Sequence, residues 1–217
     1  MVTSLIMMIV FFIGVLLLLS LQPKTTMMTL GMKMRRAKSA QESLAEFIKT
    51  KKNRWGIKQY YIFSEENVRS LGHRFVGRFD SAILHWEDSP VLDAIIEYKF
   101  PVKHIPKIAR PEDVFQSGLY ALALLESGVS CSSAKLVTIY CPQEIAMSCL
   151  DRKSTRDCWR CGSASVKVTR FKPKSVLKKL QRLDEVWYNG RVPNPTQEPH
   201  NCRVCPYSNG RCNYSLI

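Results

Sequence analysis

The chain has 217 residues, a length that suits one globular domain with an appendage. Its hydrophobic fraction of 46% is ample for a real core. The 32 lysines and arginines outnumber the 18 aspartates and glutamates, so the formal net charge is +14. Such an excess favours polyanions as partners, either nucleic acid or an anionic membrane surface.

The first expected element is an apolar segment at the N-terminus. Leu5–Leu21 carries no charged side chain and is just long enough to span a bilayer. Basic residues follow it from Lys24 onward and none precede it, so the positive-inside rule places the rest of the chain in the cytoplasm. We therefore expect a single transmembrane anchor over 1–21 and a basic linker over 22–36. The alternative is a soluble cytoplasmic protein that starts at one of the methionines between Met27 and Met34.

The remaining residues, 37–217, show the pattern of an α/β domain. Apolar spacing and turn residues predict a helix over 39–52, strands over 57–63, 73–86 and 91–100, a helix from Pro111 to Gly128, strands over 134–141 and 163–171, and a long helix from Pro173. The strand over 91–100 is almost wholly apolar, which is typical of a strand buried on both faces. The order of elements predicts a mixed central β-sheet flanked by helices.

A pair of carboxylates and a lysine stand out in the middle of this pattern. Asp80 follows Gly77-Arg-Phe, and Glu97 and Lys99 lie two residues apart on a predicted strand, so both point to one face. A buried carboxylate needs a partner, and a divalent cation is one. Two carboxylates with an ammonium group are the minimal set for metal-assisted phosphodiester hydrolysis. The alternative is that Asp80 caps a turn and that Glu97 and Lys99 form a surface ion pair.

Three motifs in this order resemble a known nuclease family. Gly-Arg-Phe-Asp80, then Glu97-Tyr-Lys99, then Gln116-x3-Tyr120 on the next helix, is similar to the RecB-like branch of the PD-(D/E)XK nucleases. The tail from Cys202 to Cys212 resembles that of the CRISPR-associated iron–sulfur exonucleases of this branch, and the likeness covers roughly 37–217. The resemblance implies a restriction-endonuclease-like fold and Mg²⁺ or Mn²⁺ bound by Asp80 and Glu97. It also implies that Lys99 is catalytic and that Gln116 and Tyr120 hold DNA near the site.

The chain departs from the family pattern at two places. The family carries a metal-binding histidine on its first helix, whereas no histidine precedes His73 here, and Glu42 or Glu46 is left as a substitute. The family's iron–sulfur cluster takes one cysteine from near the N-terminus and three from the tail, whereas the first cysteine here is Cys131.

The eight cysteines suggest metal binding, because disulfides are unusual in the cytoplasm. The tail over 200–217 contains Cys202, Cys205 and Cys212, and a second C-x2-C motif lies at Cys158 and Cys161. Three tail thiolates with one from the second motif would suit a 4Fe–4S cluster, and Cys158, Cys161, Cys202 and Cys205 would equally suit a tetrahedral zinc site, with His200 a weaker ligand. We expect Cys131, Cys141 and Cys149 to be small buried apolar residues.

Together these patterns predict a metal-dependent deoxyribonuclease, anchored at the cytoplasmic face of a membrane, that acts on single strands or ends. Basic residues on both sides of the second C-x2-C would contact phosphates, namely Arg152, Lys153, Arg156, Arg160, Lys167, Arg170, Lys172 and Lys174. Trp159 and Tyr98 would stack on bases or, alternatively, pack in the core. Two other functions stay open, an inactive nuclease-fold protein that binds nucleic acid and an adaptor at the membrane surface with a structural zinc site.

Overall fold

The computed structural model describes residues 7, 30–50, 59–150, 155–192, 194, 199–206, 208 and 210–216. The chain divides into two compact units, Met1–Val176 and Leu177–Ile217. Apart from Met7, the expected anchor over 1–21 lies outside the described residues. Among the residues that are described, no helix is both long enough and apolar enough to cross a membrane.

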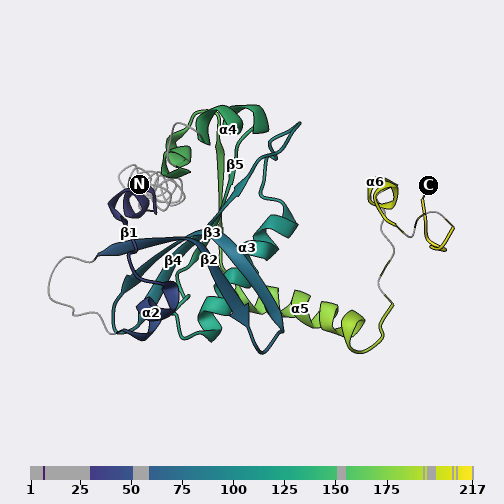
Figure 1. The fold of residues 1–217 in the computed structure, drawn as a ribbon, viewed down its shortest axis with the longest axis horizontal. Coiled ribbons are helices and arrows are strands. Elements are labelled where there is room, and N and C mark those ends of the chain that lie inside the picture. The colour runs from purple at the N-terminus through teal and green to yellow at the C-terminus, as the bar shows by residue number, and fades with distance from the viewer. Residues whose placement is uncertain are drawn as a thin grey trace. The chain divides into compact units, whose positions relative to one another are not determined.

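The first unit is built on one six-stranded sheet with strands in the order β1-β2-β3-β4-β5-β6 (Figure 1). The strands are β1 (Lys38–Ser39), β2 (Tyr60–Ser70), β3 (Phe75–Trp86), β4 (Pro90–Lys99), β5 (Lys135–Tyr140) and β6 (Ser165–Arg170). The β1–β2 and β4–β5 pairs are parallel and the other pairs are antiparallel. The predicted mixed α/β sheet is therefore confirmed.

The helices are α2 (Leu44–Lys49), α3 (Pro111–Glu126), α4 (Gln143–Leu150), the 3-10 helix η1 (Thr155–Arg160), α5 (Pro173–Trp187) and α6 (Pro199–Arg203). Helix α3 begins at Pro111, as predicted, because proline lacks only an N–H that has no partner in the first turn. After its end, Gly128 takes a φ of +90°, which a residue with a side chain rarely adopts.

Helix α2, which corresponds to the helix predicted over 39–52, is shorter than predicted and spans Leu44–Lys49. Ser39 lies in β1 and pairs with Ile62, so it cannot cap a helix. The capping box is formed instead by Ser43 and Glu46, each side chain bonding the other's backbone N–H. Phe47 of α2 is fully buried and makes edge-to-face contacts with three aromatic rings, those of Tyr61, Phe63 and Trp86.

Residues 30–36, which the sequence assigns to a basic linker, form a helix on the sheet. Leu30 and Met34 are buried in one cluster with residues of β3, β4 and β5, namely Ile83, Ala94, Ile96, Val137 and Ile139. Lys33 from the same helix forms a salt bridge with the buried Asp93, which also contacts His85. The predicted linker over 22–36 is therefore wrong for residues 30–36. Leu30 and Met34 are four residues apart, so they lie on one face of the helix, and this face is buried against the sheet.

The core lies on both faces of the sheet, and strand β5 contributes side chains to each face. Val137 and Ile139 pack in the cluster beneath the helix over 30–36, whereas Leu136 lies on the α3 side, near Gly118. Alternation along a strand places Thr138 and Tyr140 on the α3 side as well. Glu97 and Lys99 of β4 are the parallel partners of these two residues, so they also face α3.

Candidate active site

Strands β3 and β4 separate at the residues that the sequence singles out. Their ladder ends at the pair Ser81 and Ile96, and Asp80 and Glu97 are the next residue on each strand. Beyond this point β3 stays paired with β2, while β4 stays paired with β5 as far as Lys99. The sheet therefore opens at Asp80 and Glu97.

The two carboxylates bind backbone N–H groups at this opening. The N–H of Asp80 donates to Glu97 Oε1 at 3.3 Å, and the N–H of Tyr98 donates to Asp80 Oδ2 at 2.7 Å. Side-chain oxygens thus replace the ladder acceptors that these backbone donors have lost. The alternative that Asp80 caps a turn is wrong, because Asp80 lies inside β3. The alternative that Glu97 and Lys99 form a surface ion pair is also wrong, because Glu97 is only 2% exposed.

Burial of Glu97 has an electrostatic cost. The pKa of its carboxyl is raised to about 7, first by burial and then by the charge of Asp80, while Lys99 acts in the opposite direction. A divalent cation beside Glu97 would offset both effects on the Glu97 carboxyl, the burial and the charge of Asp80. This donor set therefore fits Mg²⁺ or Mn²⁺, which prefer one or two carboxylates together with water and phosphate oxygens.

Lys99 connects the carboxylates to helix α3. Its Nζ lies 3.6 Å from Glu97 Oε2 and donates to Gln116 Oε1 at 2.6 Å. Gln116 Nε2 in turn donates to the Tyr120 hydroxyl at 2.8 Å, as expected for residues four apart on one helical face. The structure therefore joins Lys99, Gln116 and Tyr120, the three predicted residues outside the carboxylate pair, in one chain of hydrogen bonds.

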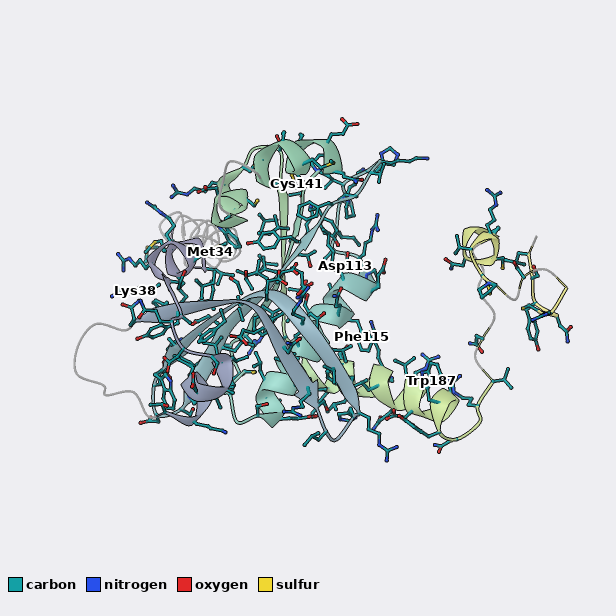
Figure 2. The ribbon with its side chains drawn as sticks, viewed as in Figure 1. Met34, Lys38, Asp113, Phe115, Cys141 and Trp187 are labelled. Atoms are coloured by element: carbon teal, nitrogen blue, oxygen red, sulfur yellow. The ribbon has the colours of Figure 1, made fainter. Side chains whose placement is uncertain are left out.

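Two residues of this site were missed by the sequence analysis. Asp113 of α3 lies 3.9 Å from Lys99 Nζ through Oδ1, and its other oxygen accepts a hydrogen bond from the Tyr140 hydroxyl. Figure 2 shows Asp113 at the start of α3, beside the sheet. The spacing of Asp113, Gln116 and Tyr120 puts all three on one helical face, a signal that was present in the sequence. Tyr140 is fully buried at the end of β5, and only the fold brings it here.

Gly77, the first residue of the Gly-Arg-Phe-Asp motif, lets α3 approach β3 closely. A Cβ atom at this position would lie 2.5 Å from Cε1 of Tyr120, much closer than carbon atoms approach each other. The Tyr120 ring also makes an edge-to-face contact with Phe79. The motif therefore shapes the wall of the site as well as supplying Asp80.

Metal binding by the cysteines is not shown. In the part of the chain that is described, no three His, Cys, Asp or Glu side chains stand together as a metal-binding group. Cys158 and Cys161 belong to the first unit and Cys202, Cys205 and Cys212 to the second, and the units' relative positions are not determined. The predicted 4Fe–4S cluster or zinc site that combines them therefore stays a prediction.

The two aromatic residues considered for base stacking pack instead against the core. Tyr98 and Trp159 are partly buried beside the cluster beneath the helix over 30–36. The Trp159 ring covers Gly31, where an added Cβ would lie 2.5 Å from its Nε1. Of the basic residues, Arg152 and Lys153 lie outside the described residues, whereas Arg160, Arg170, Lys172 and Lys174 are exposed.

No protein-family model matches the chain, and no curated protein is significantly similar to it.

Proposed function

We propose that the chain is a metal-dependent deoxyribonuclease of the RecB-like PD-(D/E)XK type. The observation that carries this proposal is the pairing of Asp80 and Glu97 at the opening between β3 and β4, with Lys99 3.6 Å from Glu97. A structural Glu97–Lys99 ion pair would not require Asp80 beside it, since the charge of Asp80 raises the pKa of the Glu97 carboxyl and makes that group harder to ionise.

In this proposal each residue has a distinct role. Asp80 and Glu97 would hold Mg²⁺ or Mn²⁺, and the bound cation supplies charge neutralisation of the phosphate and a more acidic water. Lys99 offsets the negative charge that develops on the phosphate. Gln116 positions the Lys99 ammonium group, and Tyr120 holds Gln116 through the hydrogen bond to its amide.

The substrate class follows from charge and from the resemblance. A net charge of +14 favours a polyanion, and exposed Arg170, Lys172 and Lys174 are available for phosphate contacts. We propose DNA, single-stranded or at its ends, as the substrate. An anchor over 1–21 would hold the enzyme at the cytoplasmic face of a membrane.

The proposal is tested by a nuclease assay on the full chain with Mg²⁺, with Mn²⁺ and with a chelator. Single-stranded, linear duplex and circular DNA are the three substrates. We expect degradation that requires the metal and that falls by about 100-fold or more in Asp80→Asn and in Lys99→Met. Glu126→Gln is the matched control, because Glu126 pairs with His73 at the other end of α3.

Each alternative function has its own expected result when binding of the same chain to DNA and to anionic vesicles is measured beside the cleavage assay. DNA binding without metal-dependent cleavage would favour the inactive nuclease-fold protein. Binding to anionic vesicles with no affinity for DNA would favour the membrane adaptor. Degradation that persists in both site variants would show that the activity does not come from this site.

A further inference from the structure

A cavity of about 770 Å³ lies beside the last turn of helix α3, within the first unit. Three parts of the chain line it: Leu125 of α3, the loop over 130–132 that leads into β5, and residues 170–175, which join β6 to α5. Its volume is within the range of small-molecule sites in proteins. The carboxylates of the candidate active site lie elsewhere, near the N-terminal half of α3.

Part of the cavity lining is apolar. Phe171 and Cys131 are each only 4% exposed, and Leu125 and Pro173 add to the apolar lining. Burial raises the pKa of the Cys131 thiol to about 12, so this thiol stays neutral and acts as the small apolar residue that the sequence predicts. A lining of this kind suits the carbon-rich part of a ligand.

The exposed part of the lining is basic. The side chains of Arg170, Lys172 and Lys174 are exposed, and none of the described residues that line the cavity is acidic. Nη2 of Arg170 donates to the carbonyl of Ser132 at 3.5 Å, which joins two of the three lining segments. Charge complementarity therefore favours an anionic ligand, and the apolar part of the lining favours one that also carries carbon-rich groups.

Hydrogen bonds hold the lining segments in place. The N–H of Ser130 donates to the carbonyl of Pro90 at 2.8 Å, and the N–H of Phe171 donates to the carbonyl of Ala134 at 3.0 Å. The Cys131 thiol donates to the carbonyl of Ala121, which belongs to α3. The cavity is thus already formed without a ligand, and this lowers the entropic cost of binding one.

Helix α3 connects the cavity to the candidate active site. Gln116, which bonds Lys99, and Leu125 both belong to α3, and a rise of 1.5 Å per residue puts them about 13 Å apart along the helix axis. Neighbouring phosphates of a stacked strand are about 3.4 Å apart, so at least about four nucleotides are needed to span this distance. A short single strand can therefore reach from the carboxylates to the cavity.

We propose that this cavity binds single-stranded DNA outside the catalytic centre, with its basic residues on phosphates and its apolar lining against a sugar or base. A lipid headgroup would also match the charges, but only a nucleic acid strand can occupy the cavity and the carboxylates together. The identity of the ligand rests on the nuclease proposal, to which the cavity adds a second binding place for the same strand.

The first test measures binding of labelled single-stranded DNA to the full chain by fluorescence anisotropy, with a chelator present so that no strand is cut. The cavity variant combines Arg170→Gln, Lys172→Gln and Lys174→Gln. The charge control removes three other exposed charges and combines Arg36→Gln, Lys38→Gln and Lys49→Gln. Lys38 lies in β1, at the opposite edge of the sheet from β6.

We expect the cavity variant to bind a strand of about 12 nucleotides about 10-fold more weakly than the charge control. Loss of three phosphate contacts should also lower the slope of log affinity against log salt concentration by about 2. Three results would each overturn the proposal: equal affinities in the two variants, no DNA binding by the parent chain, or a cavity variant that loses affinity only for anionic vesicles.

A second pair of variants separates the cavity from its charge. Ser132→Trp places a ring in the lining, whereas Ser133→Trp places the same ring on its exposed neighbour outside the lining. Neither change alters the net charge. The Ser132 variant should bind the strand about 5-fold more weakly than the Ser133 variant, because its ring takes up room that the strand needs. Equal affinities in this pair would show that the strand does not enter the cavity.

Cleavage kinetics separate this proposal from the nuclease proposal. A dinucleotide is too short to reach the cavity, so the ratio of kcat/KM for the longer strand to kcat/KM for the dinucleotide should fall about 10-fold in the cavity variant. Cleavage with the same ratio in the cavity variant and the charge control would overturn the cavity proposal alone. No cleavage by the parent chain, with weaker DNA binding by the cavity variant, would overturn the nuclease proposal and support the cavity as a DNA-binding site.

Discussion

Lys99 of β4 and Gln116 of α3 are joined by a hydrogen bond of 2.6 Å between Nζ and Oε1. The same ammonium group lies 3.6 Å from Glu97 and 3.9 Å from Asp113. Gln116 thus supplies a neutral acceptor that holds Lys99 between two carboxylates. Strand β4 and the next element of the chain, helix α3, together fix the position of the Lys99 ammonium group.

The first prediction concerns this hydrogen bond. Gln116→Leu removes the acceptor and lets Lys99 move toward Glu97, so the rate of DNA cleavage should fall by about 10- to 100-fold. Gln116→Glu keeps an oxygen for Lys99 and should lose less. Single-turnover cleavage at saturating metal measures both variants. Equal rates for Gln116→Leu and the parent chain would rule out a positioning role.

The second prediction concerns pH. The Glu97 pKa is raised from 4.5 to about 7, so the metal-free folded chain binds a proton between these values that the unfolded chain has released. The stability contributed by this group is therefore complete below pH 4.5 and is lost as pH rises through about 7, by about 3 kcal/mol in all. Glu97→Gln cannot ionise and should lack this loss.

Denaturant unfolding of both chains between pH 5 and pH 8, with a chelator present, measures this difference. If Glu97 holds a cation as proposed, added metal should reverse this dependence of stability on pH, because the cation needs the ionised carboxylate. The rise in melting temperature on adding Mn²⁺ should accordingly grow from pH 6 to pH 8. A stability difference between the two chains that does not vary with pH would contradict the raised pKa.

The third prediction concerns Gly77. In Gly77→Ala the new methyl group would meet the Tyr120 ring at 2.5 Å, so the ring or β3 must shift. We expect a loss of about 1–3 kcal/mol in the free energy of unfolding, with weaker DNA cleavage. Gly72→Ala is the control, since its Cβ would lie 3.9 Å from the nearest atom, Glu126 Oε1. Similar losses in both variants would show that contact with Tyr120 is not the cause.

The fourth prediction concerns the helix over 30–36. A fragment 37–217, the boundary that the sequence indicates, lacks the buried Leu30 and Met34 and leaves Asp93 without Lys33. Burying each of these two apolar side chains is worth about 1.5–3 kcal/mol, so this fragment should be less stable than fragment 30–217 by about 3 kcal/mol or more. Thermal and urea unfolding compare the two fragments. Equal stabilities would show that the helix does not contribute to the core.

The sequence predicts well those elements whose signals are local. The apolar run of β4, the Pro111 start of α3 and the spacing of Gln116 and Tyr120 depend on neighbours within a few residues, and the structure agrees with all three. The predicted Ser39 cap fails because the sheet uses Ser39 in β1, a pairing that local propensity does not reveal. The helix over 30–36 was missed because its charged residues outweigh the two apolar residues that it buries.

The sequence by itself determined the α/β class and the basic charge, and it singled out Asp80, Glu97, Lys99, Gln116 and Tyr120 as candidate site residues, because composition, periodicity and motif spacing follow directly from the residues. Only the tertiary structure decided which of those residues meet. The opening between β3 and β4 brings Asp80 to Glu97, and Asp113 of α3 and Tyr140 of β5 join them. Contacts of this kind depend on strand register and on where the ladder ends, which are properties of the whole sheet.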